Sequence, residues 1–292
     1  MYGRILKNQN GYFTVSGKDG RLMICRSKGS LKKETDILVG DLVEYETDAP
    51  GKAVIVKVHP RKNQLYRPPV SNIDHLLLVS SIRMPDINLF LLDRMILSAE
   101  NAGMTPIICI NKCDLAEKEA EIVASHYEKS GYISLCTSIP KKRGLNELET
   151  RLRTIKSSII AISGPSGVGK SSLLNYLLHT SYFLSGDVSQ RTGRGKSTTR
   201  HAELVSFNND SYVMDTPGYT FLNIDHMDIN HLDFLFKDFR PYLGKCRFNN
   251  CCHISEPECS IKKAVEEKHI ATRRYESYVH VYQELKEIKK YK

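Results

Sequence analysis

The segment Gly164–Ser171 reads Gly-Pro-Ser-Gly-Val-Gly-Lys-Ser and constrains the fold more than any other part of the chain. It matches the phosphate-loop pattern G-x-x-x-x-G-K-[ST], with an apolar run before it and a helical pattern after it. Such glycines let backbone N–H groups and a helix N-terminus point at phosphate oxygens. We expect Lys170 to reach the β- and γ-phosphates and Ser171 to bind Mg²⁺. The nucleotide ligands expected here are Gly164, Pro165, Ser166, Gly167, Val168, Gly169, Lys170, Ser171 and Ser172.

Apolar runs alternate with helical periodicity across the middle of the chain, which predicts a parallel sheet covered by helices. The expected strands are 76–79, 106–110, 132–136, 159–163 and 212–215, and the expected helices are 88–102, 117–130, 145–155 and 171–178.

A guanine-specific motif, N-K-x-D, is matched by Asn111, Lys112, Cys113 and Asp114, directly after the expected strand 106–110. Guanine offers two N–H donors that the Asp114 carboxylate accepts together. Adenine lacks this pair and would leave a buried carboxylate unpaired, which is costly. The sequence therefore favours GTP, and an ATPase is the alternative that nucleotide competition would test.

Thr137 and Ser138 follow the expected strand 132–136 and stand where GTPases place a loop that contacts the guanine oxygen. An ordinary strand-to-helix turn fits them equally well.

The sequence Asp215-Thr-Pro-Gly218 fits D-x-x-G, the motif that senses the γ-phosphate, and it closes the expected strand 212–215. Asp215 is expected to bind Mg²⁺ through water, and the Gly218 amide to meet the γ-phosphate. Before it lies a basic, glycine-containing loop, 191–200, in which Thr198 or Thr199 closes over Mg²⁺. A solvated loop without a ligand is the alternative for this segment.

The amino-terminal segment 1–62 reads as short strands at 2–7, 12–15, 22–26, 41–45 and 53–58, typical of a small OB-like barrel. It carries 12 Lys and Arg against 7 Asp and Glu, whereas residues 63–225 carry 17 against 16. Residues 226–292 carry 13 against 10. Basic flanks around a near-neutral centre favour RNA binding, with ordinary solvated surfaces as the alternative.

A cluster near the carboxyl end has the spacing Cys246-x₄-Cys251-x-His253-x₅-Cys259, which predicts a structural, tetrahedral Zn²⁺ site. Residue chemistry alone does not separate Cys251 from the adjacent Cys252. Further along, Arg273, Arg274 and Tyr275 face either RNA or solvent.

The base motif precedes the phosphate loop, since Asp114 comes 50 residues before Gly164, the reverse of the order in Ras-like GTPases. One site survives such a permutation because compact domains often have neighbouring termini. With the barrel and the Cys/His tail, this order resembles the circularly permuted GTPases of the RsgA/YjeQ type. The matching segments, which span nearly the whole chain, are 67–74, 111–114, 164–172, 193–196, 198–200, 215–218 and the cysteine spacing, which in this family favours Cys251.

The resemblance implies an α/β fold with three parts: an OB-fold-like RNA-binding barrel (1–62), a circularly permuted GTPase domain (63–225) and a mostly helical zinc-binding domain (226–292). It also implies GTP hydrolysis stimulated by the small ribosomal subunit, with that subunit and its rRNA as partners during late maturation. A non-catalytic RNA-binding module that senses GTP is the alternative. The chain has no run of about 20 apolar residues and no secretory signal, so we expect a cytoplasmic protein without membrane contact. We also expect a monomer, although the sequence does not determine the oligomeric state.

The sequence departs from the family pattern where a histidine usually precedes the paired threonines, because Ser197 stands there. Tyr219 follows Gly218, and its ring lacks the amide that orients water in Ras-type enzymes. His201 is a nearby substitute. We therefore expect slow intrinsic turnover that needs the partner.

Overall fold

The computed structural model describes residues 1–29, 31, 36–49, 52–66, 69–179, 203–208, 210–215, 224–225 and 227–290. The chain divides into two compact units. The first unit comprises Met1–Leu77, Ala102–Thr105 and Asn146–Tyr219, and the second unit comprises Leu78–Asn101, Pro106–Leu145 and Thr220–Lys292.

The first unit begins with a barrel, whose described strands close in the order β1-β2-β3-β5-β4. The strands are β1 (Tyr2–Gln9), β2 (Tyr12–Gly17), β3 (Leu22–Ser27), β4 (Leu42–Ala49) and β5 (Lys52–Val58). Ile5, Val15, Val43 and Ile55 are fully buried inside it. In β2 the buried residues Phe13 and Val15 are two positions apart, the period of a strand with one face in the core. The five-stranded OB-like barrel expected from the sequence is confirmed.

A buried aspartate ties the barrel to the segment that follows it. The Asp41 carboxylate accepts hydrogen bonds from the Leu38 N–H at 2.8 Å and the Ser71 hydroxyl at 2.6 Å, and it pairs with Arg61 at 2.7 Å. Ser71 ends β7 (Pro69–Ser71), which pairs with β6 (Gln64–Tyr66). A side chain at Gly40 would meet the Ser71 carbonyl oxygen, because a Cβ there would lie 2.1 Å from it.

The described strands of the central sheet have the order β10-β9-β8-β11-β13-β12. They are β8 (His75–Ser81), β9 (Thr105–Asn111), β10 (Ile133–Cys136), β11 (Ile159–Ser163), β12 (Val205–Asn208) and β13 (Ser211–Asp215). β10 is parallel to β9, and β11 is parallel to β13. β8 begins in the first unit and ends in the second. The five strands expected here are confirmed, whereas the antiparallel edge strand β12 was not expected.

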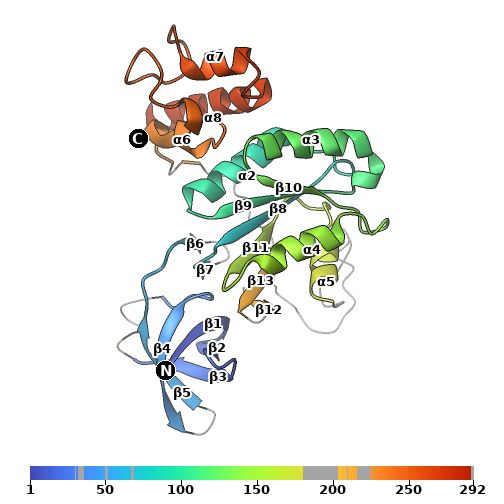
Figure 1. Cartoon of the computed structure of the whole chain (residues 1–292). Coiled ribbons are helices and arrows are strands. Elements are labelled where there is room, and N and C mark those ends of the chain that lie inside the picture. The colour runs from blue at the N-terminus through green and yellow to red at the C-terminus, as the bar shows by residue number, and fades with distance from the viewer. Residues whose placement is uncertain are drawn as a thin grey trace. The chain divides into compact units, whose positions relative to one another are not determined.

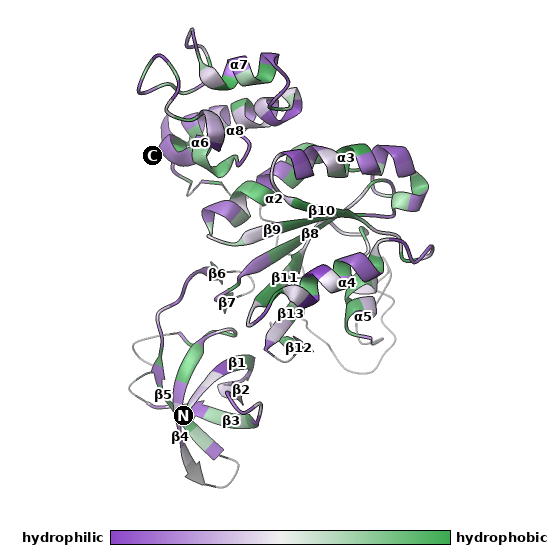
Figure 2. Cartoon of the chain, viewed as in Figure 1, coloured by the Kyte–Doolittle hydropathy of each residue, from purple (hydrophilic) through white to green (hydrophobic). Residues whose placement is uncertain are grey.

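Helices cover the strands within each unit. They are α2 (Leu89–Asn101), α3 (Glu117–Lys129), α4 (Leu145–Thr154) and α5 (Lys170–Leu177). In the second unit α2 and α3 lie beside β9 and β10 (Figure 1). The strands β8 to β11 are mostly green, that is hydrophobic, in Figure 2. Continuous apolar strands are typical of parallel sheets that helices cover on both faces, so the expected α/β layering is confirmed.

The carboxyl-terminal part of the second unit is mostly helical, as expected. It contains η2 (Ile229–His231), α6 (Leu232–Leu235), η3 (Arg240–Tyr242), α7 (Ser260–Glu266) and α8 (Thr272–Lys290). Phe236, Phe239 and Tyr278 form its aromatic core, with ring centroids 4.9–5.4 Å apart. None of the helices in the described ranges is both long and apolar enough to cross a membrane.

Candidate functional site

The phosphate loop lies between β11 and α5 in the first unit. All five residues of β11 are buried, so the strand holds the start of the loop firmly. Gly167 and Gly169 have φ values of 77° and 97°, a region that side chains with a Cβ rarely adopt. Gly169 caps α5, and Ser171 and Ser172 are half-buried in its first turn. The expected strand–loop–helix arrangement is therefore present.

Lys170 lies across the loop that it is expected to serve. Its ammonium group donates to the carbonyl oxygens of Gly164 at 2.8 Å and Pro165 at 2.7 Å. These two hydrogen bonds hold the Lys170 ammonium group against the backbone of the phosphate loop. The charge is therefore already placed where phosphate oxygens would enter.

β13 brings the γ-phosphate motif to the same edge of the sheet. Its last residue, Asp215, is paired in register with Ile162 of the parallel strand β11. The carboxyl ends of parallel neighbours meet at one edge, which is where open α/β sheets bind ligands. The Asp215 side chain, Thr198 and Gly218 lie outside the described residues, as do Ser197, His201 and Tyr219, so their expected roles stay predictions.

The base motif follows β9 in the second unit. Asn111 is buried, with 2 % of its surface exposed, whereas Asp114 is exposed in the short helix η1 (Cys113–Leu115). Lys112 has a left-handed backbone and donates through its ammonium group to the Met84 carbonyl oxygen. The buried asparagine therefore fixes the loop while the aspartate faces outward.

Thr137 braces the base motif from the next strand. Its hydroxyl donates to the Asn111 side-chain oxygen at 3.0 Å, and the Cys109 sulfur lies 3.1 Å from that hydroxyl. The Cys113 N–H donates to the Thr137 carbonyl oxygen at 3.0 Å. Burial raises the pKa of the Cys109 thiol to about 12, so it stays neutral beside the threonine. The two loops expected from the sequence are thus bonded to each other.

The loop after Ser138 closes back on β10, which sequence reasoning missed. Ser138 and Arg143 exchange two backbone hydrogen bonds, at 3.0 and 3.1 Å. A Cβ at Gly144 would lie 1.9 Å from the Cys136 carbonyl oxygen, so only glycine fits there. The glycine itself was the signal, since a glycine just before a helical pattern often marks a close backbone approach.

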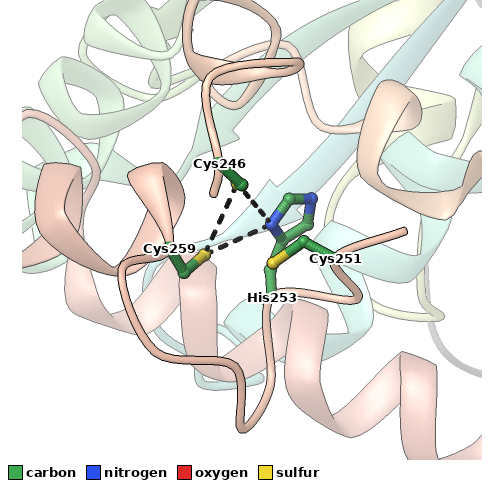
Figure 3. A group of neighbouring side chains, drawn as sticks. All are labelled: Cys246, Cys251, His253 and Cys259. Atoms are coloured by element: carbon green, nitrogen blue, oxygen red, sulfur yellow. Dashed lines mark hydrogen bonds between the residues drawn. The ribbon is translucent and has the colours of Figure 1, made fainter. Parts of the chain in front are cut away.

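The predicted zinc ligands come together in the second unit. The ligand atoms of Cys246, Cys251, His253 and Cys259 all lie within 4.8 Å of one another. The His253 ring nitrogen Nδ1 faces Cys246 at 3.5 Å and Cys259 at 3.3 Å (Figure 3). The sulfurs of Cys246 and Cys259 are 3.9 Å apart, close to the roughly 3.8 Å that two sulfurs on tetrahedral zinc would have.

Other contacts support that assignment. Cys252 is outside this set and points its sulfur at the Asn250 carbonyl oxygen, so the geometry favours Cys251. The far ring nitrogen of His253 lies 3.3 Å from the Asp233 carboxylate, the arrangement that commonly orients a metal-binding histidine. Three thiols, one imidazole and a supporting carboxylate fit a structural zinc ion. The sequence spacing of the four candidate ligands gives no indication that Asp233 supports His253.

Arg274 corrects the expectation that it faces RNA or solvent. Its side chain is 2 % exposed and pairs with Asp93 at 2.7 Å and Asp238 at 3.0 Å. Burial alone would lower the pKa of this guanidinium, but the two carboxylates more than offset that and raise it. Tyr275, also expected to face RNA or solvent, donates its hydroxyl to the His253 carbonyl oxygen at 2.7 Å. These residues of α8 therefore hold the carboxyl-terminal part together.

Comparisons with known proteins agree with this geometry. The RsgA GTPase family model matches residues 58–225, and the RsgA N-terminal domain model matches residues 2–55. The chain belongs to the RsgA GTPase family. The circularly permuted GTPase fold suggested by the motif order, and with it a GTP-hydrolysing activity, are confirmed.

Relatives of this RsgA-family chain align along nearly its whole length. A protein named small ribosomal subunit biogenesis GTPase RsgA, from Caldanaerobacter subterraneus subsp. tengcongensis, is 40 % identical, with 99 % of this chain and 97 % of the relative covered. One of the same name from Geobacillus kaustophilus is 39 % identical, with 98 % of each covered.

Solved structures of family members have the same fold. YloQ, described as a circularly permuted GTPase, has a TM-score of 0.83 and 29 % identity over 98 % of this chain and 95 % of YloQ. YjeQ from Thermotoga maritima has a TM-score of 0.82 and 35 % identity over 97 % of this chain and 98 % of YjeQ.

Proposed function

We propose that this RsgA-family GTPase acts in the biogenesis of the small ribosomal subunit, hydrolysing GTP when bound to that subunit and its rRNA. The observation that carries the proposal is full-length similarity to relatives named for this role, at 35–40 % identity. The basic amino- and carboxyl-terminal flanks support an rRNA partner, because phosphate contacts dominate nucleic-acid affinity. The protein works as a monomer in the cytoplasm.

GTP is bound in two halves on this proposal. The phosphate loop 164–172 holds the phosphates through backbone N–H groups and Lys170. The exposed Asp114 accepts both donors of the guanine edge, while Lys112 packs along the base. The support is that each loop follows the carboxyl end of a strand of the central sheet, and that solved relatives are permuted GTPases.

Mg²⁺ is proposed to neutralise the phosphate charge, held by Ser171, Thr198 and, through water, Asp215. The Gly218 amide then meets the γ-phosphate. Stabilising the charge of the transferred phosphoryl group is most of the catalytic task in such enzymes. Because Ser197 and Tyr219 lack suitable groups, we expect the attacking water to be positioned only after the subunit binds.

A structural Zn²⁺ held by Cys246, Cys251, His253 and Cys259 is proposed to order the carboxyl-terminal part. With four protein ligands the site is closed, so zinc supplies folding energy and takes no part in hydrolysis.

GTP turnover measured with and without purified small subunits tests the proposal. Wild type is expected to release phosphate slowly alone and at least about tenfold faster with subunits, in line with partner-stimulated GTPases. Lys170→Ala should lose turnover in both conditions, while Lys118→Ala, an exposed lysine on α3, should retain it. Equal rates with and without subunits would contradict the partner, and ATP competing as well as GTP would contradict the base assignment.

A further inference from the structure

The first unit has a cavity of about 820 Å³ between the barrel and the amino ends of β11 and β13. On the barrel side it is lined by Tyr2 and Lys18. On the other side it is lined by Ser157, Asp210 and Tyr212. Both walls belong to the same compact unit, and the ion pair between Lys7 and Glu203, at 2.8 Å, links β1 of the barrel to the segment before β12.

A second cavity, of about 370 Å³, continues the first. It shares Ser157 and Asp210 with the larger cavity and adds Arg153 and Lys156. We treat the two adjoining cavities as one groove, which we call the junction groove. A groove made of two adjoining cavities suits a chain-like ligand better than a small, enclosed one.

An aromatic ring is exposed at the barrel end of the junction groove. Tyr2 is 51 % exposed, with the Lys18 ammonium nitrogen 5.1 Å from its ring centroid. The His59 ring lies 5.7 Å away. An accessible aromatic face beside a cation is the usual platform on which an unstacked nucleic-acid base binds.

Basic side chains line both ends of the junction groove. Arg4 and Lys18 lie at the barrel end, and Arg153 and Lys156 at the other. Arg4 donates to the Gly40 carbonyl oxygen and Arg153 pairs with Glu149, so the two lysines are the cations that would contact phosphates. Cations spaced along a groove track a phosphate backbone.

Two acidic residues, Asp19 and Asp210, also line the junction groove. Asp19 is engaged by Arg21, whose Nε lies 3.4 Å from its carboxylate and whose backbone N–H donates to it at 3.1 Å. Asp210 lines both cavities, the smaller one together with Arg153 and Lys156. A carboxylate there accepts from ribose hydroxyls or from the amino groups of bases.

The junction groove is separate from the phosphate loop. β11 runs from Ile159 to Ser163, so Ser157 lies at its amino end and Gly164 at its carboxyl end. Five strand residues span about 16 Å. A ligand in the junction groove therefore leaves the phosphate loop accessible.

We propose that the junction groove binds a single-stranded stretch of RNA, with a base stacked on Tyr2 and phosphates beside Lys18 and Lys156. Duplex RNA keeps its bases stacked inside the helix and cannot use the Tyr2 ring. This inference deepens the proposed function, on which it rests for RNA as the partner, and names the surface and the class of RNA.

Fluorescence anisotropy with a labelled single-stranded RNA of about eight nucleotides tests this on the full chain. Tyr2→Ala is expected to weaken binding about tenfold, and Tyr2→Phe, which keeps the ring, to stay within about twofold of wild type. Lys156→Ala should reduce the slope of log affinity against log salt by about 0.7, the value for one single-strand phosphate contact.

Matched controls lie elsewhere. Tyr12 is 45 % exposed on the barrel but outside the junction groove, and Lys118 is exposed on α3. Tyr12→Ala and Lys118→Ala should each change affinity less than about twofold. An unchanged Tyr2→Ala variant, or an equal loss in Tyr12→Ala, would overturn the proposal.

Competition separates the possible ligands. Unlabelled single-stranded RNA should displace the probe, whereas a duplex of the same length and adenosine monophosphate should not at equal concentration. Displacement by either would assign the surface to a different ligand and overturn the proposal. The binding assay needs no hydrolysis, so a wild-type protein without turnover would contradict the proposed function and leave this result standing.

Discussion

Each unit holds a fully buried aspartate, and the two are satisfied in different ways. Asp41 of the first unit accepts from a backbone N–H, from a serine hydroxyl and from Arg61, whose side chain is 18 % exposed. Asp93 of the second unit accepts from the side chains of Arg273, Arg274, Ser277 and Tyr127. Asp41 is thus held by a neighbouring backbone N–H together with two side chains from the following segment, and Asp93 only by side chains from other helices.

The difference lies in what happens when a partner is lost. Water can reach Arg61, so its charge is solvated even without Asp41. Arg274 is 2 % exposed and shares its charge with both Asp93 and Asp238. Removing one member of such a buried set leaves an uncompensated charge, which is far more costly than losing a half-exposed pair. The second unit should therefore be the more easily broken of the two.

Loss of the metal should produce the largest difference in stability between the second unit and the first. Cys259→Ser removes one of the four proposed ligands, and structural zinc typically contributes on the order of 10 kcal/mol to folding. We expect zinc loss and faster amide hydrogen exchange in α7 and α8, with the barrel strands unchanged. Zinc content and hydrogen exchange measure this. Cys252→Ser, the adjacent cysteine outside the ligand set, should keep its zinc; equal zinc in both variants would refute the assignment.

Arg274→Met should have the next largest effect. It leaves the Asp93 and Asp238 carboxylates buried without their shared cation, so we expect a loss of about 3–5 kcal/mol in unfolding free energy. Denaturant unfolding followed by hydrogen exchange of α8 measures it. Arg273→Met, whose side chain is 32 % exposed, is the matched control and should cost about 1 kcal/mol. Similar losses in the two variants would show that burial does not set the difference.

Asp41→Ala tests the contribution of the buried aspartate in the first unit. It leaves the Leu38 N–H without an acceptor and the Ser71 hydroxyl with only its long contact to the Val39 carbonyl oxygen, at 3.4 Å, which should cost about 2 kcal/mol. Denaturant unfolding monitored on the barrel strands is the measurement, with the exposed Glu46→Ala as a control expected to stay within about 0.5 kcal/mol of wild type. A loss larger than that of Arg274→Met would reverse the order of the two units.

The smallest effect concerns pH. Burial lowers the pKa of His75 from 6.5, with Asp74 opposing the shift. The unfolded chain therefore binds a proton that the folded chain excludes, and stability is lost as pH falls below about 6.5. His75→Gln should flatten this loss between about pH 7 and pH 5 in thermal unfolding curves. His231→Gln, which alters an exposed ring, should keep the wild-type slope, and a slope unchanged in both would exclude His75 as its cause.

The elements that could be predicted from sequence depend on neighbouring residues. The phosphate loop needs glycines and a lysine in consecutive positions, and the zinc ligands lie within 14 residues, so both are legible in the sequence. The barrel and the parallel strands could be predicted from short runs of alternating or continuous apolar residues that are bounded by turn residues.

The features that were missed depend on distant partners. Asp93 and Arg274 are 181 residues apart, and no residue near Arg274 in the sequence indicates that it pairs with a buried carboxylate. The bond between Thr137 and Asn111 joins neighbouring strands 26 residues apart. β12 is four residues long, and its place at the edge is decided by pairing with β13 more than by its own composition. Such pairings are set by tertiary structure, which overrides local propensity.

The Asp93 cluster also bears on how the base loop behaves. α3 begins three residues after Asp114, and near its end Tyr127 donates to Asp93 at 2.9 Å. Shifting α3 would break that buried bond, so the helix after Asp114 is held in place. On the proposed function, guanine would therefore meet a base loop that is already ordered, and little conformational entropy would be lost when it binds.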